Sequence, residues 1–157
     1  MGTRQMNLLA LDLGTQLGWA LMDVNGTIKH GSVGFHPRMK DGPGQRWLRF
    51  VAHLSSLKRQ VGEIHVCYYE RAERHLGTQA AHAFGAFESH LQVFCEVNLI
   101  RLETVGVGQI KKSWTGRGNA DKEAMIVEAR RRGFRVTDDN AADALAILHV
   151  GLKQEGA

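Results

Sequence analysis

The chain has 157 residues, of which 43% are hydrophobic and 23% charged, with only two prolines. This length suits a single domain, 1–157, and the composition excludes a disordered or proline-rich chain. The net charge of +4 at pH 7 would favour binding to a polyanion without identifying one. The two cysteines match no zinc or disulfide spacing, so we expect a reducing, cytoplasmic location. No segment is apolar for long enough to cross a membrane.

The first part of the chain alternates apolar runs with short turns. The runs cover residues 7–13, 19–24 and 28–35, and the turns between them lie at 14–18 and 25–27. The first run is nearly unbroken, which is typical of a strand buried on both faces. Strands joined by such short turns form an antiparallel meander.

The remaining chain alternates helical and strand patterns. Residues 44–61 repeat apolar side chains at spacings of three and four and end at Gly62, which predicts an amphipathic helix. Residues 64–69 are then a strand parallel to the first. A helix is expected at 78–97, a fifth strand at 99–102, and helices at 107–115, 121–132 and 139–153. This order predicts an α/β, ribonuclease-H-like fold: a five-stranded mixed sheet, three antiparallel strands then two parallel ones, flanked by helices.

Three acidic residues stand where the pattern predicts burial. Asp12 interrupts the first strand, Glu70 follows the strand at 64–69, and Asp143 lies within the segment AADALAIL. A buried carboxylate needs a cation, hydrogen bonds or a metal ion nearby. Carboxylates brought together repel one another unless a divalent cation lies between them. Oxygen ligands favour magnesium or manganese over zinc, and two such ions can hydrolyse a phosphodiester.

Each acid also has an ordinary structural interpretation. A single Asp or Glu at a strand end or in a first helical turn is more often a turn former or a helix cap. For Asp138 and Asp139, near the start of the last predicted helix, capping is the natural interpretation. The coincidence of Asp12, Glu70 and Asp143 in three apolar settings is what favours one shared site.

Several segments are similar to the RuvC family of Holliday junction resolvases. LALDLGTQLGWAL resembles that family's first strand and turn, CYYE its second acidic strand end, and DDNAADALAIL its terminal acidic helix. The segment KKSWTGRGNADK, from Lys111 to Lys122, is similar to the family's basic segment. Each motif alone is weak, but together they follow the family's order from the first strand to the last helix.

The resemblance implies a homodimeric, magnesium-dependent crossover junction endodeoxyribonuclease of DNA recombination and repair. The metal ligands would be Asp12, Glu70 and Asp143, with two Mg²⁺ per active site and Mn²⁺ as a substitute. Lys111 and Lys122 would contact backbone phosphate or stabilise charge near the scissile group. Lys112 and Arg117 would extend this DNA-binding surface, because the stretch 111–135 is rich in basic residues.

The chain departs from the family three residues before Asp143. The family carries an Asp or His ligand there, and this chain has Asn140. A neutral amide is a weaker magnesium ligand than a carboxylate. Asp139, four residues before Asp143, can face the same side of a helix and take the role. The metal set therefore includes Asp139, and whether Asp139 or Asn140 completes it stays open.

The second departure is the segment RAERHLGTQ after Glu70. It is shorter than the family's loop and lacks the aromatic residue that the loop presents to the junction, in which it resembles the broader-specificity phage members. Arg71, Arg74 and His75 stand there instead, and we expect them to contact DNA. The sequence preference and symmetry of cleavage stay open.

Three other functions are compatible with the sequence. The same fold could instead cleave the RNA strand of RNA–DNA hybrids, or it could cleave flaps. The turn Asp12-Leu13-Gly14-Thr15 resembles the phosphate-binding turn of actin-like ATPases, which would make the chain an ATP-binding fragment. An inert DNA-binding module is the third possibility, and it predicts that Asp12→Asn leaves function unchanged.

Overall fold

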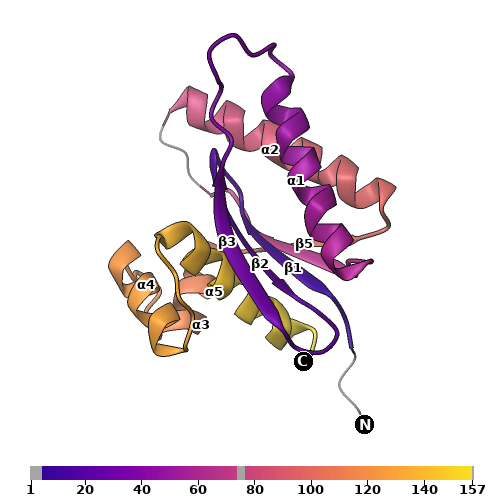
Figure 1. The fold of residues 1–157 in the computed structure, drawn as a ribbon. Coiled ribbons are helices and arrows are strands. Elements are labelled where there is room, and N and C mark those ends of the chain that lie inside the picture. Colours follow the sequence, from indigo (N-terminus) through magenta and orange to yellow (C-terminus); the bar gives the residue numbers. More distant parts are fainter. Residues whose placement is uncertain (1–4, 74–76, 157) are drawn as a thin grey trace.

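A five-stranded mixed sheet forms the centre of the molecule in the computed structural model, which describes residues 5–73 and 77–156 (Figure 1). The strands are β1 (Leu8–Asp12), β2 (Gln16–Met22), β3 (Ile28–Gly34), β4 (Val66–Glu70) and β5 (Arg101–Val105). They lie in the order β3-β2-β1-β4-β5. β1, β2 and β3 pair antiparallel, whereas β4 is parallel to both β1 and β5. The predicted ribonuclease-H-like sheet is confirmed.

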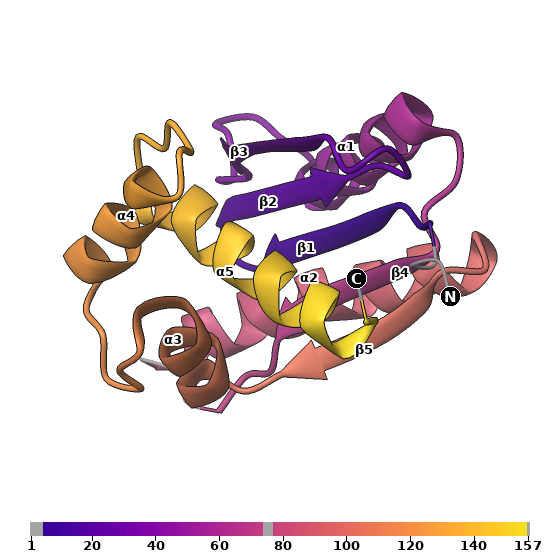
Figure 2. The same ribbon diagram turned by 90° about the horizontal axis from the view of Figure 1, so that it is seen from below.

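Helices cover both faces of the sheet (Figure 2). One face carries α1 (Gln45–Val61) and α2 (Thr78–Val97), and the other carries α3 (Val107–Thr115), α4 (Lys122–Arg131) and α5 (Asp139–Gln154). None of the helices in the described ranges is both long and apolar enough to traverse a membrane.

The unbroken apolar run of β1 supplies two separate cores. Leu8 and Ala10 pack in the core beneath α5, and Leu9 and Leu11 pack in the core beneath α1 and α2. Successive side chains of a strand point to opposite faces, so a strand covered on both faces needs apolar residues at every position. This is why β1 lacks the alternation of a half-exposed strand.

The largest errors in the predicted strand boundaries are in β2 and β5. β2 begins at Gln16 instead of residue 19, because Leu17 is fully buried and Gly18 pairs with Asp12, so the turn is shorter than expected. β5 begins at Arg101 instead of residue 99 and ends at Val105. Leu99 has a φ of 57° and is 90% exposed, so this leucine belongs to the turn after α2.

A buried asparagine ties the start of β1 to its neighbours. Asn7 is 5% exposed, and its amide nitrogen donates to the carbonyl of Glu63 at 2.6 Å. Its amide oxygen accepts a hydrogen bond of 2.8 Å from the backbone N–H of Val24. We expect Asn7→Ala to lower the free energy of unfolding by about 2–3 kcal/mol, because buried backbone groups lose their partners. Urea unfolding followed by tryptophan fluorescence measures this loss.

The matched control is Asn25→Ala, which removes the same side chain from an exposed turn. An exposed substitution of this kind changes stability by less than about 0.5 kcal/mol. Equal effects of the two changes would show that the bonds of Asn7 contribute nothing.

Candidate active site

The candidate site lies where three elements meet at one edge of the sheet. β1 and β4 are parallel, so their carboxyl ends share this edge. Asp12 is the last residue of β1 and Glu70 the last residue of β4. Helix α5 begins here with Asp139 and carries Asp143 in its second turn. The elements therefore bring together the acids that the sequence predicts as one cluster.

Gly18 allows α5 to start this close to the sheet. It pairs with Asp12 across the β1–β2 hairpin. A Cβ built on Gly18 would overlap the backbone carbonyl of Asn140, which is in the first turn of α5. A residue with a side chain would push the helix away from the strand, so glycine here sets the separation between Asp12 and the acids of α5.

Asp138 holds the end of α5 in place. Its carboxylate accepts a hydrogen bond of 2.9 Å from the backbone N–H of Ala141, and it accepts another from the hydroxyl of Ser32 on β3. The capping interpretation of Asp138 is therefore confirmed. Asp139 is the first helical residue, so its side chain is not used as the cap.

The acids act on one another electrostatically. Burial raises the pKa of Asp12 well above its ordinary value, and the charges of Asp143, Glu70 and Asp139 raise it further. The pKa of Asp143 is raised to about 7 by burial first, and then by Asp139 and Glu70. Four carboxyl groups from three elements therefore repel one another when they are ionised, and their full ionisation is unfavourable without a cation.

Two lysines face this cluster. The Nζ of Lys122 lies 3.9 Å from the carboxylate of Asp139. The charges of Lys111 and Lys122 both lower the pKa of Asp143, against the larger effect of burial. The ammonium of Lys111 also lowers the pKa of Glu70, whose net shift is still upward because of burial. The two ends of the predicted basic segment thus meet the acids, although they lie on different helices.

A cleft of about 640 Å³ opens beside the two strand ends. Its lining residues are Asp12, Leu13, Glu70, Arg71, Ala72, Glu73, Phe84 and Val107. The sequence interpretation missed Glu73, whose charge raises the pKa of Glu70 after the effects of burial and Lys111. Glu73 also pairs with Arg71 at 3.5 Å. No periodic pattern marks Glu73, because it lies in a loop, and only its proximity to Glu70 in the sequence could have suggested it.

The carboxylates suit a divalent cation in chemistry but are not closed around one. Across residues 5–73 and 77–156, no three His, Cys, Asp or Glu side chains stand close enough together to form a ready-made metal site. Repulsion between unneutralised carboxylates opposes such convergence. The donors are all carboxylate oxygens, and burial, followed by the charges of the neighbouring acids, raises the pKa of both Asp12 and Asp143. This donor set fits magnesium or manganese.

Of the other predicted DNA contacts, three lie on exposed parts of the described structure and two lie outside it. Lys112 and Arg117 are exposed at the end of α3 and in the loop after it. Arg71 is exposed and paired with Glu73. Arg74 and His75 lie outside the described residues.

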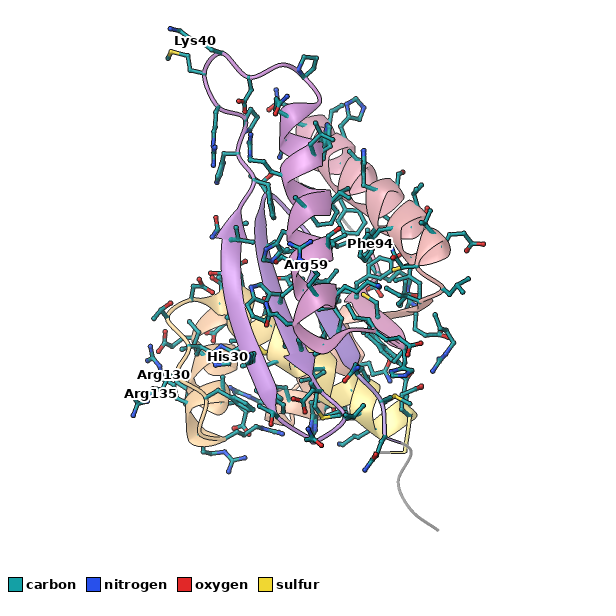
Figure 3. All side chains as sticks on the ribbon, turned by 45° about the vertical axis from the view of Figure 1, so that its right-hand side comes forward. His30, Lys40, Arg59, Phe94, Arg130 and Arg135 are labelled. Carbon is teal, nitrogen blue, oxygen red and sulfur yellow. The ribbon has the colours of Figure 1, made fainter. Side chains whose placement is uncertain are left out.

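The basic stretch 111–135 is not one uniform surface. Arg131 and Arg132 both pair with Glu128, at 2.5 and 2.8 Å, and the guanidinium of Arg132 lies 4.0 Å from the ring centroid of Trp114. By contrast, the side chains of Arg130 and Arg135 point outward from the α3–α4 side of the molecule (Figure 3). Arg131 and Arg132 are therefore neutralised by an acid of the chain, and Arg130 also donates a hydrogen bond of 3.3 Å to the carbonyl of Val136.

The fold is similar to solved structures of Holliday junction resolvases. Thermus thermophilus RuvC in complex with a Holliday junction substrate matches with a TM-score of 0.79 over 96% of each chain, at 20% identity. A second structure of Thermus thermophilus RuvC matches with a TM-score of 0.74, at 20% identity, over 96% of this chain and 97% of that one. The yeast mitochondrial Holliday junction resolvase Ydc2 matches with a TM-score of 0.66 over 97% of this chain and 80% of its own, at 12% identity.

No family model matches the sequence, and no curated protein matches it. At identities of 12–20% the likeness establishes a shared fold. The chain therefore has the ribonuclease-H-like fold of RuvC, and its activity has to be argued from the site.

Proposed function

We propose that the chain is a structure-selective DNA endonuclease that resolves Holliday junctions by metal-dependent phosphodiester hydrolysis. The observation that carries the proposal is the cluster of Asp12, Glu70, Asp143 and Asp139 at one sheet edge, within electrostatic range of one another. The cluster occurs in a fold whose similar structures are named as resolvases. We take residues 1–157 as one nuclease domain.

Asp12, Glu70, Asp143 and Asp139 would hold the metal ions, for which we propose two Mg²⁺ per site. When bound, magnesium supplies Lewis acidity at the scissile phosphate and lowers the pKa of water. The chain's own acids would fix the position of this charge at the ends of β1 and β4 and in the first turns of α5. Carboxylates serve here as ligands, so the site needs no nucleophile from the protein.

The lysines would bind the substrate. Lys122, 3.9 Å from Asp139, and Lys111 place two ammonium groups beside the acids, where they can contact the phosphates next to the cleaved one. Lysine is a compact charge suited to phosphate, and such contacts position DNA without reading its sequence. Lys112, Arg117 and Arg71 would extend the contact along the backbone.

We further propose that the enzyme is a homodimer. Val93 and Val97, near the end of α2, are 64% and 75% exposed, and Leu99, in the turn after it, is 90% exposed. A groove of about 530 Å³ lies beside the two valines, against α1. Exposed apolar side chains gathered in this way are typical of an interface. A two-fold dimer would present two sites to two strands of a four-way junction.

We also propose a cytoplasmic location, which the free thiols of Cys67 and Cys95 fit.

The test of this function is cleavage of a synthetic four-way junction in magnesium, beside a matched duplex, a flap and an RNA–DNA hybrid. We expect nicks near the branch point of the junction and none in the duplex. Chelation with EDTA should abolish cleavage. Equal cleavage of all four substrates would contradict resolvase specificity, whereas tight ATP binding without any cleavage would contradict a nuclease.

The fourth ligand can be tested with adjacent substitutions. The charge of Asp139 raises the pKa of both Asp12 and Asp143, whereas Asn140 meets the sheet through its backbone at Gly18. We therefore expect Asp139→Asn to reduce junction cleavage by at least about 10-fold. Asn140→Ala keeps the backbone contact and should leave the rate nearly unchanged. The opposite ranking of the two variants would assign the role to Asn140.

A further inference from the structure

The segment 36–44 joins β3 to α1 beside the candidate site and projects beyond the sheet edge (Figure 1). β3 is parallel to β1, because each pairs antiparallel with β2. Its carboxyl end therefore shares the edge that carries Asp12, two strand spacings or about 10 Å away. At its base, the backbone N–H of Phe35 donates to the carbonyl of Thr15 at 2.7 Å. Arg46 donates to the Thr15 hydroxyl at 2.6 Å, so the loop is fixed to the turn that follows Asp12.

The tip of this loop is held in one shape. The carboxylate of Asp41 accepts hydrogen bonds from the backbone N–H of Arg38 at 3.0 Å and from the guanidinium of Arg49 at 2.9 Å. The backbone N–H of Asp41 returns a bond to the carbonyl of Arg38 at 3.0 Å. Pro37 and Pro43, the two prolines of the chain, flank this turn and reduce its freedom before any partner binds. A tip ordered in advance has less entropy to lose on binding.

The tip presents an apolar side chain between two cations. Met39 is 92% exposed, with Arg38 before it and Lys40 after it. Lys40 has a φ of 69°, a conformation that costs a residue other than glycine roughly 1 kcal/mol. The Lys40 side chain stands at the outer end of the loop, away from the sheet (Figure 3). The turn closed by the Asp41 N–H on the Arg38 carbonyl accounts for the φ of Lys40, whereas packing does not explain the exposed methionine.

We propose that the tip, residues 38–41, is a second DNA-contacting element, with Met39 as a wedge against an exposed base step and with Arg38 and Lys40 on the neighbouring phosphates. Methionine is among the apolar side chains that proteins insert between base steps, and branched DNA exposes such steps. Cations on both sides favour a polyanion over an apolar protein partner. The inference rests on the proposed function.

Binding of the intact protein to a four-way junction in EDTA, where no cleavage occurs, tests the role of the cations. Lys40→Gly tests the charge of Lys40 most directly. Glycine readily adopts the positive φ of this position, so the variant loses the charge and keeps the fold. We expect it to weaken binding by a few-fold to about tenfold at low salt and to reduce the salt slope by about 1. Lys40→Arg should bind like the wild type.

The wedge is tested with 2-aminopurine placed at the branch point, whose fluorescence rises when its neighbours unstack. We expect a smaller rise with Met39→Ala than with the wild type, and a rise close to the wild type with Met39→Leu. The matched control is the double change Lys58→Ala and Arg59→Ala, which removes two charges from the last turn of α1, roughly 20 Å from the first residue of that helix. This control should leave both signals nearly unchanged.

The outcomes separate the two proposals. A wild-type protein that neither binds nor cuts the junction overturns both. A wild type that cuts the junction while Lys40→Gly and Met39→Ala behave like the α1 control overturns the inference alone. The inference is also overturned if Met39→Ala changes the mass measured by light scattering and leaves DNA binding intact, because the tip is then a contact between copies of the chain.

Discussion

Asp12→Asn is expected to lower junction cleavage by about 10³-fold or more while junction binding in EDTA changes little. The amide keeps the size of the side chain but removes a negative charge from the centre of the cluster, where Asp12 interacts with Asp143, Glu70 and Asp139. A metal contributes several kcal/mol to such a reaction, and each 1.4 kcal/mol corresponds to about tenfold in rate. Single-turnover cleavage of a labelled junction measures the loss.

The same substitution should stabilise the metal-free protein. The pKa of Asp12 is raised on folding, so the folded state binds its proton more tightly, and ionised Asp12 destabilises the fold at higher pH. At pH 8 in EDTA we expect Asp12→Asn to melt about 3 °C or more above the wild type. The difference should shrink as the pH falls toward the ordinary range of an aspartate, because wild-type Asp12 then becomes neutral.

The control is Glu63→Gln, which removes one negative charge near the opposite edge of the sheet, before β4. The Glu63 side chain is 72% exposed, so its substitution should change neither cleavage nor the pH dependence of melting. Magnesium should raise the melting temperature of the wild type and of this control, and raise that of Asp12→Asn much less. Full cleavage by Asp12→Asn would contradict the proposed role of Asp12 as a metal ligand in the reaction.

Gly18→Ala is the second large effect that we expect. The added Cβ would overlap the carbonyl of Asn140, which is backbone and cannot rotate away. Either β2 or the first turn of α5 has to move. We expect a loss of about 1–3 kcal/mol in the free energy of unfolding. Because the movement separates Asp12 from Asp139 and Asp143, we also expect cleavage to fall by about 10²-fold.

Gly85→Ala provides the comparison, since a Cβ at that position of α2 meets no atom within 4 Å. Alanine in a helix should stabilise the protein by up to about 1 kcal/mol without changing cleavage. Urea unfolding gives the stability of both variants, and cleavage is measured well below their unfolding midpoints. If Gly18→Ala loses stability but cuts at the wild-type rate, the spacing between β2 and α5 does not set the geometry of the site.

The sequence predicts the parts of the site that depend on burial patterns. Asp12 and Glu70 are visible because each interrupts or ends an apolar run, and parallel pairing then places them at one edge. Asp143 is visible because alanines around it indicate close packing. The roles of Asp12, Glu70, Asp143 and Asp139 as metal ligands all stay predictions.

Other features depend on tertiary contacts that no local pattern encodes. Gly18 resembles a turn glycine in the sequence, and only the approach of Asn140 explains it. The predicted start of β5 is two residues too early, because Leu99 is apolar but exposed. Glu73 enters the site from a loop, where spacing carries no information about direction.

The arrangement of the acids along the chain also affects when the activity can arise. Asp12 comes from the first strand, and Asp139 and Asp143 come from the last helix, which packs across β1 and β2. During synthesis the early strands leave the ribosome well before α5 does. Until that helix docks on the sheet, the cluster has lost two of its four acids. Under the proposed function, cleavage of DNA would therefore begin only after the last helix has docked.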